Sequence, residues 1–98
     1  MDDVISLIST EVEADELLIE DVTESSREVY CTVKSVSAKE LADSRSTDLI
    51  PAYQFTVFAG DYESENILEY HGERYSVYRT YMKSADQIEL YAGRKAGV

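Results

Sequence analysis

Apolar and polar residues alternate in several short segments of this chain, which is the pattern of half-buried β-strands. Segments 27–36, 52–59 and 87–92 show the alternation most clearly. Because successive side chains of a strand point to opposite sides, the apolar set on one side is the candidate core. That set consists of Val29, Cys31, Val33, Tyr53, Phe55, Val57, Ile88, Leu90 and Ala92.

The first 26 residues divide less regularly. A short apolar run in 1–9 predicts a strand, and the acidic sequence EVEADE at 11–16 predicts a turn or loop after it. A second apolar run spans 17–22, and TESS at 23–26 separates it from the next segment. The sequence therefore predicts two short strands before a third that begins at Arg27.

Segment 65–83, with the sequence ENILEYHGERYSVYRTYMK, predicts a β-hairpin that turns at His71 and Gly72. The alternation predicts two faces for its second strand, one with Tyr75, Val77, Arg79 and Tyr81 and the other with Ser76, Tyr78, Thr80 and Met82. Three tyrosines of this arm suit cross-strand packing in the core better than an interface, although tyrosine is common at both. A buried Arg79 would need an acidic partner, because an unpaired interior guanidinium is very costly.

The middle of the chain predicts the only helix. Ser37 and Glu40 have the spacing of a capping box, which indicates a short helix over 38–44. The residues after it follow neither period and end at the only proline, so we expect a flexible loop made of Ser44, Arg45, Ser46, Thr47, Asp48, Leu49, Ile50 and Pro51. The expected fold is one mainly β domain over 1–98: a small β-barrel or sandwich of about six to seven antiparallel strands with one short helix.

The charge of the chain restricts its partners. Twenty acidic and nine basic residues give a formal net charge of −11, which opposes binding to phosphate backbones and anionic membranes. Such acidity favours solubility or attraction to a basic partner. No apolar stretch is long enough for a membrane helix, and the N-terminus is acidic where a signal peptide is basic, so we expect a cytoplasmic protein.

The residues offer little chemistry. His71 is the only histidine and falls in a predicted turn, while Cys31, the only cysteine, falls among valines on a strand face, where a small buried side chain is expected. The acids of DYESE at 61–65 lack the spacing of a calcium loop, and no glycine-rich loop opens a helix. We therefore expect no enzyme activity, no metal and no cofactor.

Three segments between Arg27 and Gly93 resemble the head-closure proteins of long-tailed phages, also called stopper or head-tail joining proteins. They are REVYCTVKSVSAKEL, then PAYQFTVFAGDYESENILEYHGERYSVYRTYMK, then DQIELYAG. The most specific parts of the resemblance are the arm GERYSVYRTY and the last strand IELY. The acidic sequence before Arg27 lies outside it.

The resemblance implies a small β-barrel or sandwich that is monomeric when free and assembles into a ring on the portal and adaptor vertex after DNA packaging. There it would close the channel and provide the platform for the tail, so the protein would move from the host cytoplasm to the virion neck. In some relatives the loop that matches Ser44–Pro51 gates the channel, and carboxylates such as Asp43 and Asp48 would then repel DNA. Two alternatives stay open: an acidic DNA-mimic inhibitor of a DNA-binding enzyme, and a tail-completion or terminator protein.

Overall fold

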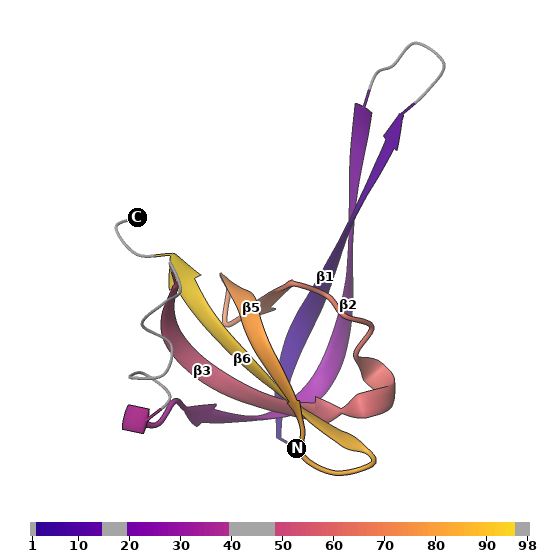
Figure 1. Ribbon diagram of the computed structural model, residues 1–98. Coiled ribbons are helices and arrows are strands. Elements are labelled where there is room, and N and C mark those ends of the chain that lie inside the picture. Colours follow the sequence, from indigo (N-terminus) through magenta and orange to yellow (C-terminus); the bar gives the residue numbers. More distant parts are fainter. Residues whose placement is uncertain (1, 15–19, 40–48, 96–98) are drawn as a thin grey trace.

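The computed structural model describes residues 2–14, 20–39 and 49–95, which form a closed antiparallel β-barrel (Figure 1). The strand order around the barrel is β1-β2-β3-β6-β5-β4. The strands are β1 (Asp3–Ala14), β2 (Glu20–Ser35), β3 (Leu49–Phe58), β4 (Ile67–Tyr70), β5 (Glu73–Met82) and β6 (Gln87–Lys95), with a short 3-10 turn η1 at Ala59–Asp61. The predicted mainly β fold is confirmed.

The first two strands are much longer than the sequence predicted. β1 pairs with β2 without interruption from Asp3↔Cys31 to Ala14↔Glu20. The acidic residues 11–14 therefore belong to a strand and not to a loop, and 23–26 lie inside β2 instead of breaking it. The pattern of acids was misleading because β1 and β2 pair through backbone groups, which acidic residues carry as well as apolar ones.

The core follows the predicted faces of β2, β3 and β6. Inward side chains meet in register, because Cys31 is opposite Val57 and Phe55 is opposite Leu90. All four of these side chains are fully buried. The core cluster consists of Ile5, Leu7, Val29, Cys31, Phe55, Val57, Leu68, Tyr75, Ile88, Leu90 and Ala92. Removing this apolar surface from water stabilises the barrel.

The hairpin between β4 and β5 turns where the sequence predicted. Tyr70 pairs with Glu73, and the two residues between them have positive φ angles, 51° at His71 and 79° at Gly72. A two-residue turn of this kind matches the twist of the flanking strands. The predicted hairpin is confirmed.

The second half of β5 has its faces exchanged relative to the prediction. The register with β6 shifts between Val77 and Arg79, so Tyr78 is an extra residue that interrupts the alternation. Thr80 and Met82 consequently lie opposite the inward residues Leu90 and Ile88. Arg79 is exposed, with its guanidinium 4.0 Å from the centre of the Tyr91 ring. A single sequence shows no sign of such a bulge.

The predicted helix and loop are described only in part. Ala38 and Lys39 have helical backbone, whereas 40–44 lie outside the described residues. Of the predicted loop, 44–48 also lie outside them. The prediction of a loop is wrong for Leu49, Ile50 and Pro51, which are the first residues of β3 and pair with β6. β6 continues beyond the alternating segment 87–92 to Lys95 and supplies that pairing.

Candidate functional site

The most prominent feature of the molecule is an arm, which we define as Ser9–Ala14 of β1 and Glu20–Ser25 of β2 (Figure 1). β1 touches β4 only through Ser6–Ile8, so the six pairs beyond Ile8 have no other strand beside them in the described chain. Six residues of strand span about 20 Å. The radius of gyration of 14.9 Å exceeds the roughly 13 Å of a compact chain of this length, as expected for a projecting arm.

The arm is acidic in sequence. Its described strands contain no lysine or arginine, and their acidic residues are Glu11, Glu13, Glu20, Asp21 and Glu24. The sequence pattern predicted a loop at 11–16 and a separate short strand over 17–22, so it did not predict the arm. One signal was available: Thr10, Val12 and Ala14 alternate with acids, and the register places Val12 opposite Val22.

One ion pair braces the foot of the arm against the β4–β5 hairpin. Arg74 donates to Glu24 through both terminal nitrogens, with an Nη1–Oε2 distance of 3.0 Å. The hydrogen bonds from Arg74 hold the pKa of Glu24 below its ordinary value. Glu69 lies 3.9 Å from Nε of the same arginine. The bidentate geometry fixes direction as well as charge, so it helps to set the angle of the arm.

A second arginine anchors the segment that crosses from η1 to β4. Arg27 lies opposite the inward residue Leu7, and its guanidinium contacts Glu63 at 2.8 Å and Glu65 at 2.9 Å. It also donates to the carbonyl oxygen of Asp61. The Glu65 side chain is only 2% exposed, and its other oxygen accepts the Glu63 N–H at 2.7 Å. A buried carboxylate thus receives the charge that it needs from β2.

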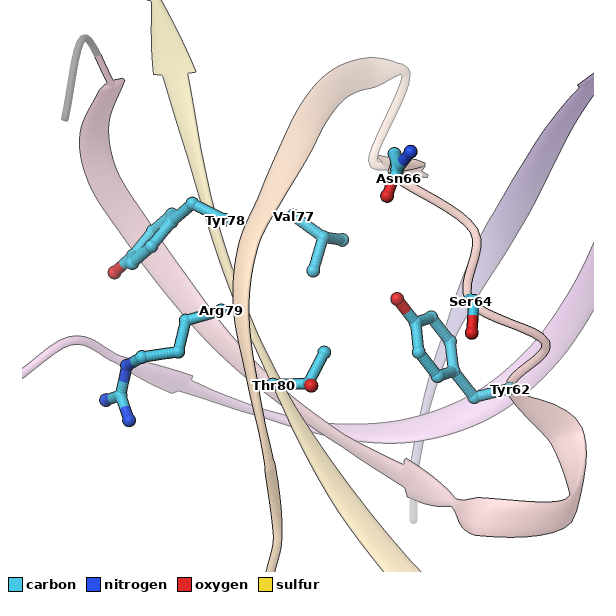
Figure 2. A pocket seen from close by; sticks show the side chains of 7 residues that line it. All are labelled: Tyr62, Ser64, Asn66, Val77, Tyr78, Arg79 and Thr80. Atoms are coloured by element: carbon cyan, nitrogen blue, oxygen red, sulfur yellow. The ribbon is translucent and has the colours of Figure 1, made fainter.

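A shallow pocket of about 290 Å³ lies between this segment and β5 (Figure 2). Val77 and Thr80 extend from β5 toward it, while Tyr78 and Arg79 extend to the other side of the strand. At one end of the pocket the Val77 N–H donates to the Asn66 carbonyl at 2.8 Å. The Tyr62 hydroxyl donates to the Glu65 carbonyl, also at 2.8 Å. The lining residues are Tyr62, Ser64, Asn66, Val77, Tyr78, Arg79 and Thr80.

The outer face of the barrel carries a small exposed apolar row. Val4 pairs with Tyr30. Tyr30 precedes Cys31 in β2 and Phe58 follows Val57 in β3, so the two lie next to the inward pair of Cys31 and Val57. The exposed fractions are 42% for Val4, 67% for Tyr30 and 49% for Phe58. These outward side chains enlarge the surface that is suited to protein contacts.

The residues with catalytic potential are placed as expected. His71 is exposed in its turn and stacks on Tyr70. Cys31 is fully buried, and burial raises the pKa of its thiol to about 11, with a smaller contribution from Asp3. Within 2–14, 20–39 and 49–95, no three or more His, Cys, Asp or Glu side chains come together as a metal site.

The tyrosines of β5 divide between core and surface. Tyr75 is 7% exposed and belongs to the core, whereas Tyr81 is 57% exposed. Tyr78 is half-buried. The prediction of core packing is therefore right for Tyr75 and wrong for Tyr81, because the bulge turns Tyr81 outward, opposite Glu89.

No family model matches the chain, and no curated protein matches it in sequence. In the part of the chain that the structure describes, no helix has the length and apolar composition needed to span a membrane.

Proposed function

We propose that this chain is a structural assembly protein of the phage neck. In this role it docks onto the portal and adaptor vertex after DNA packaging, closes the channel and provides the attachment platform for the tail. The observation that carries the proposal is the arm, which extends about 20 Å of paired strand beyond the barrel. An extension of this length gives the protein additional surface for contact with a partner.

The described chain divides into a barrel and an arm. A closed barrel leaves few unpaired strand edges and forms a rigid body. A two-stranded hairpin on its own is only marginally stable in water, so the arm gains stability by lying against another molecule. Its acidic composition steers encounters toward basic patches, which raises association rates and disfavours acidic partners.

The resemblance to head-closure proteins supplies the rest of the proposal. It covers Arg27–Gly93, which corresponds to the barrel from β2 onward. The barrel is thus the part of the chain that resembles the family, and the acidic arm adds a further contact element to it. In the assembled neck, carboxylates that face the channel would repel DNA phosphates and let the genome pass without sticking.

The test uses tailless, DNA-filled heads. Adding the purified chain should yield stable genome retention and recovered tail joining. The matched variant replaces residues 11–23 with Asn-Gly, so that Thr10 and Glu24 flank a two-residue turn and the Arg74 contact is kept. This variant should fold and fail to join tails.

Each result is decisive. Heads that leak DNA and stay tailless with the full chain would refute the neck role. Equal activity of the full chain and the shortened variant would refute the part assigned to the arm. If the full chain is inactive on heads and inhibits a DNA-binding enzyme instead, the DNA-mimic alternative replaces the proposal.

A further inference from the structure

The barrel wall has a gap beside the second half of β5. β4 pairs with β5 only over Glu73–Ser76, and the pocket follows where this ladder stops. Thr80 and Met82 pair with two buried residues of β6, which places them on the inward side of β5. Both are nevertheless exposed, Met82 by 52%. Side chains on the inward side of the wall are therefore left uncovered at this place.

The segment on the other side of the gap is the direct continuation of β4. We call it the strap and define it as Tyr62–Asn66, which leads into β4 at Ile67. Its last residue already extends the ladder, because the Val77 N–H donates to the Asn66 carbonyl at 2.8 Å. Figure 2 shows the strap and β5 on opposite sides of the pocket, with the Tyr62 ring directed into the space between them. The pocket is thus the unpaired continuation of the β4–β5 ladder.

Two features keep the strap from pairing with β5. Arg27 of β2 contacts the carboxylates of Glu63 and Glu65 at 2.8 Å and 2.9 Å. The same guanidinium donates to the carbonyl oxygen of Asp61, directly before the strap. Ser64 has a φ angle of 65°, which is uncommon for a residue other than glycine and interrupts the extended backbone that a ladder needs. The strap is therefore held toward β2 and bent at its centre.

The backbone of β5 has hydrogen-bond donors that face the gap. The Lys83 N–H donates to the Gln87 carbonyl at 3.0 Å, so it points toward β6. Because N–H directions alternate along a strand, those of Thr80 and Met82 point away from β6 and toward the strap. An extended strap could accept both of them.

The register of the existing ladder fixes how the strap would pair. The ladder reaches Asn66, and the bulge adds one residue on the β5 side. Its continuation therefore places Ser64 opposite Thr80. Two residues further along, Tyr62 lies opposite Met82, on the inward side of both strands. The tyrosine ring would then cover the inward side chain that is exposed in the present arrangement.

We propose that the strap is a conformational switch with two arrangements. In the held arrangement, which the structure shows, Arg27 keeps it against β2; in the closed arrangement it is extended, pairs with β5 and completes the barrel wall. Closure exchanges the Arg27 contacts for backbone hydrogen bonds, turns Glu63 and Glu65 to the outer side and covers Met82. Because an exposed strand edge can pair with another chain, the strap controls whether β5 is open to one. The switch is a property of the isolated chain and does not depend on the neck role.

Two substitutions of Ser64 should shift the switch in opposite directions. Ser64→Val favours closure, because a β-branched residue is strained at positive φ and suits a strand, whereas Ser64→Gly favours the held arrangement. Amide hydrogen exchange followed by NMR should be several-fold slower at Thr80 and Met82 in the valine variant than in the glycine variant. The Tyr81 amide, which points toward β6, is the internal control and should be equally protected in both. Equal exchange at Thr80 and Met82 in the two variants would overturn the proposal.

A disulfide trap detects the closed arrangement directly and leaves Ser64 intact. In a Cys31→Ala background, Glu63→Cys and Tyr81→Cys would face each other on the outer side of the closed ladder, in a pair without hydrogen bonds, where Cβ atoms approach closely. Both side chains are exposed, Glu63 by 72% and Tyr81 by 57%. Under mild oxidation of dilute protein, this pair should form an intramolecular disulfide several-fold faster than the out-of-register pair of Glu63→Cys and Lys83→Cys. Equal rates for the two pairs, measured by mass spectrometry, would refute closure.

Discussion

The Arg27 guanidinium lies 2.9 Å from the Glu65 carboxylate and joins β2 to the segment that leads into β4. The contact is an ion pair without hydrogen-bond geometry at Glu65 Oε2, and the carboxylate side chain is 2% exposed, compared with 40% for Arg27. Arg27 lies on the same side of β2 as the buried Val29 and Cys31, so the inward side of this strand ends in a positive charge at the rim of the barrel. That charge holds the wall segment beside the pocket.

Replacing Arg27 with leucine should destabilise the barrel. The change leaves the Glu65 carboxylate buried without its cation, and because Arg27 is partly exposed we expect a loss of about 2–4 kcal/mol, between the values of surface and buried pairs. Urea denaturation measures it. The double variant Arg27→Leu/Glu65→Leu should recover most of the loss, since no charge is orphaned. A single variant as stable as the parent would contradict this account.

The brace between Glu24 and Arg74 should weaken in acid. Since the folded-state pKa of Glu24 is lowered by its hydrogen bonds to Arg74, its contribution to stability is complete above the unfolded pKa and is lost as the pH falls through the folded pKa. The melting temperature of Glu24→Gln should thus lie below that of the parent at pH 7, and the two should converge toward pH 3. Asp2→Asn, at an exposed residue, is the control and should show no such convergence.

The Cys31 thiol should be inert in the folded protein. A pKa of about 11 leaves about one thiol in a thousand ionised at pH 8, and the side chain is fully buried. A thiol reagent at pH 8 should label the native chain only at the rate of unfolding and label it at once in urea. Exposed Thr23→Cys in the Cys31→Ala background provides the fast reference. Rapid labelling of native Cys31 would contradict its place in the core.

Gly93 should resist substitution because β3 approaches it closely. A Cβ at this position would collide with the Ile50 carbonyl oxygen and lie 3.1 Å from Pro51 Cα, so the start of β3 would have to move. Gly93→Ala should therefore cost about 1–3 kcal/mol in denaturant unfolding. Gly72→Asn is the comparison: its φ is 79° with open space around it, and asparagine tolerates that conformation at little cost. Equal stability of both variants would refute the steric argument.

The sequence alone was sufficient for the strands that have one buried face. In β2, β3 and β6 the alternation of Val29, Phe55 and Leu90 with polar neighbours identified the core, because burial against one face leaves a period of two in the residues. The turn at His71–Gly72 was equally readable, since a two-residue turn with positive φ restricts the residues that fit.

Only the tertiary structure decided the features that depend on neighbours. The acidic pattern of the arm resembles a loop, and the backbone pairing that includes Glu11 with Thr23 is what makes these residues strands. The bulge at Tyr78 exchanges the faces of β5 through its register with β6, and the strand at Leu49 exists because β6 reaches Lys95. Pairing of this kind depends on backbone groups that are distant in the sequence, so a local pattern of side chains does not predict it.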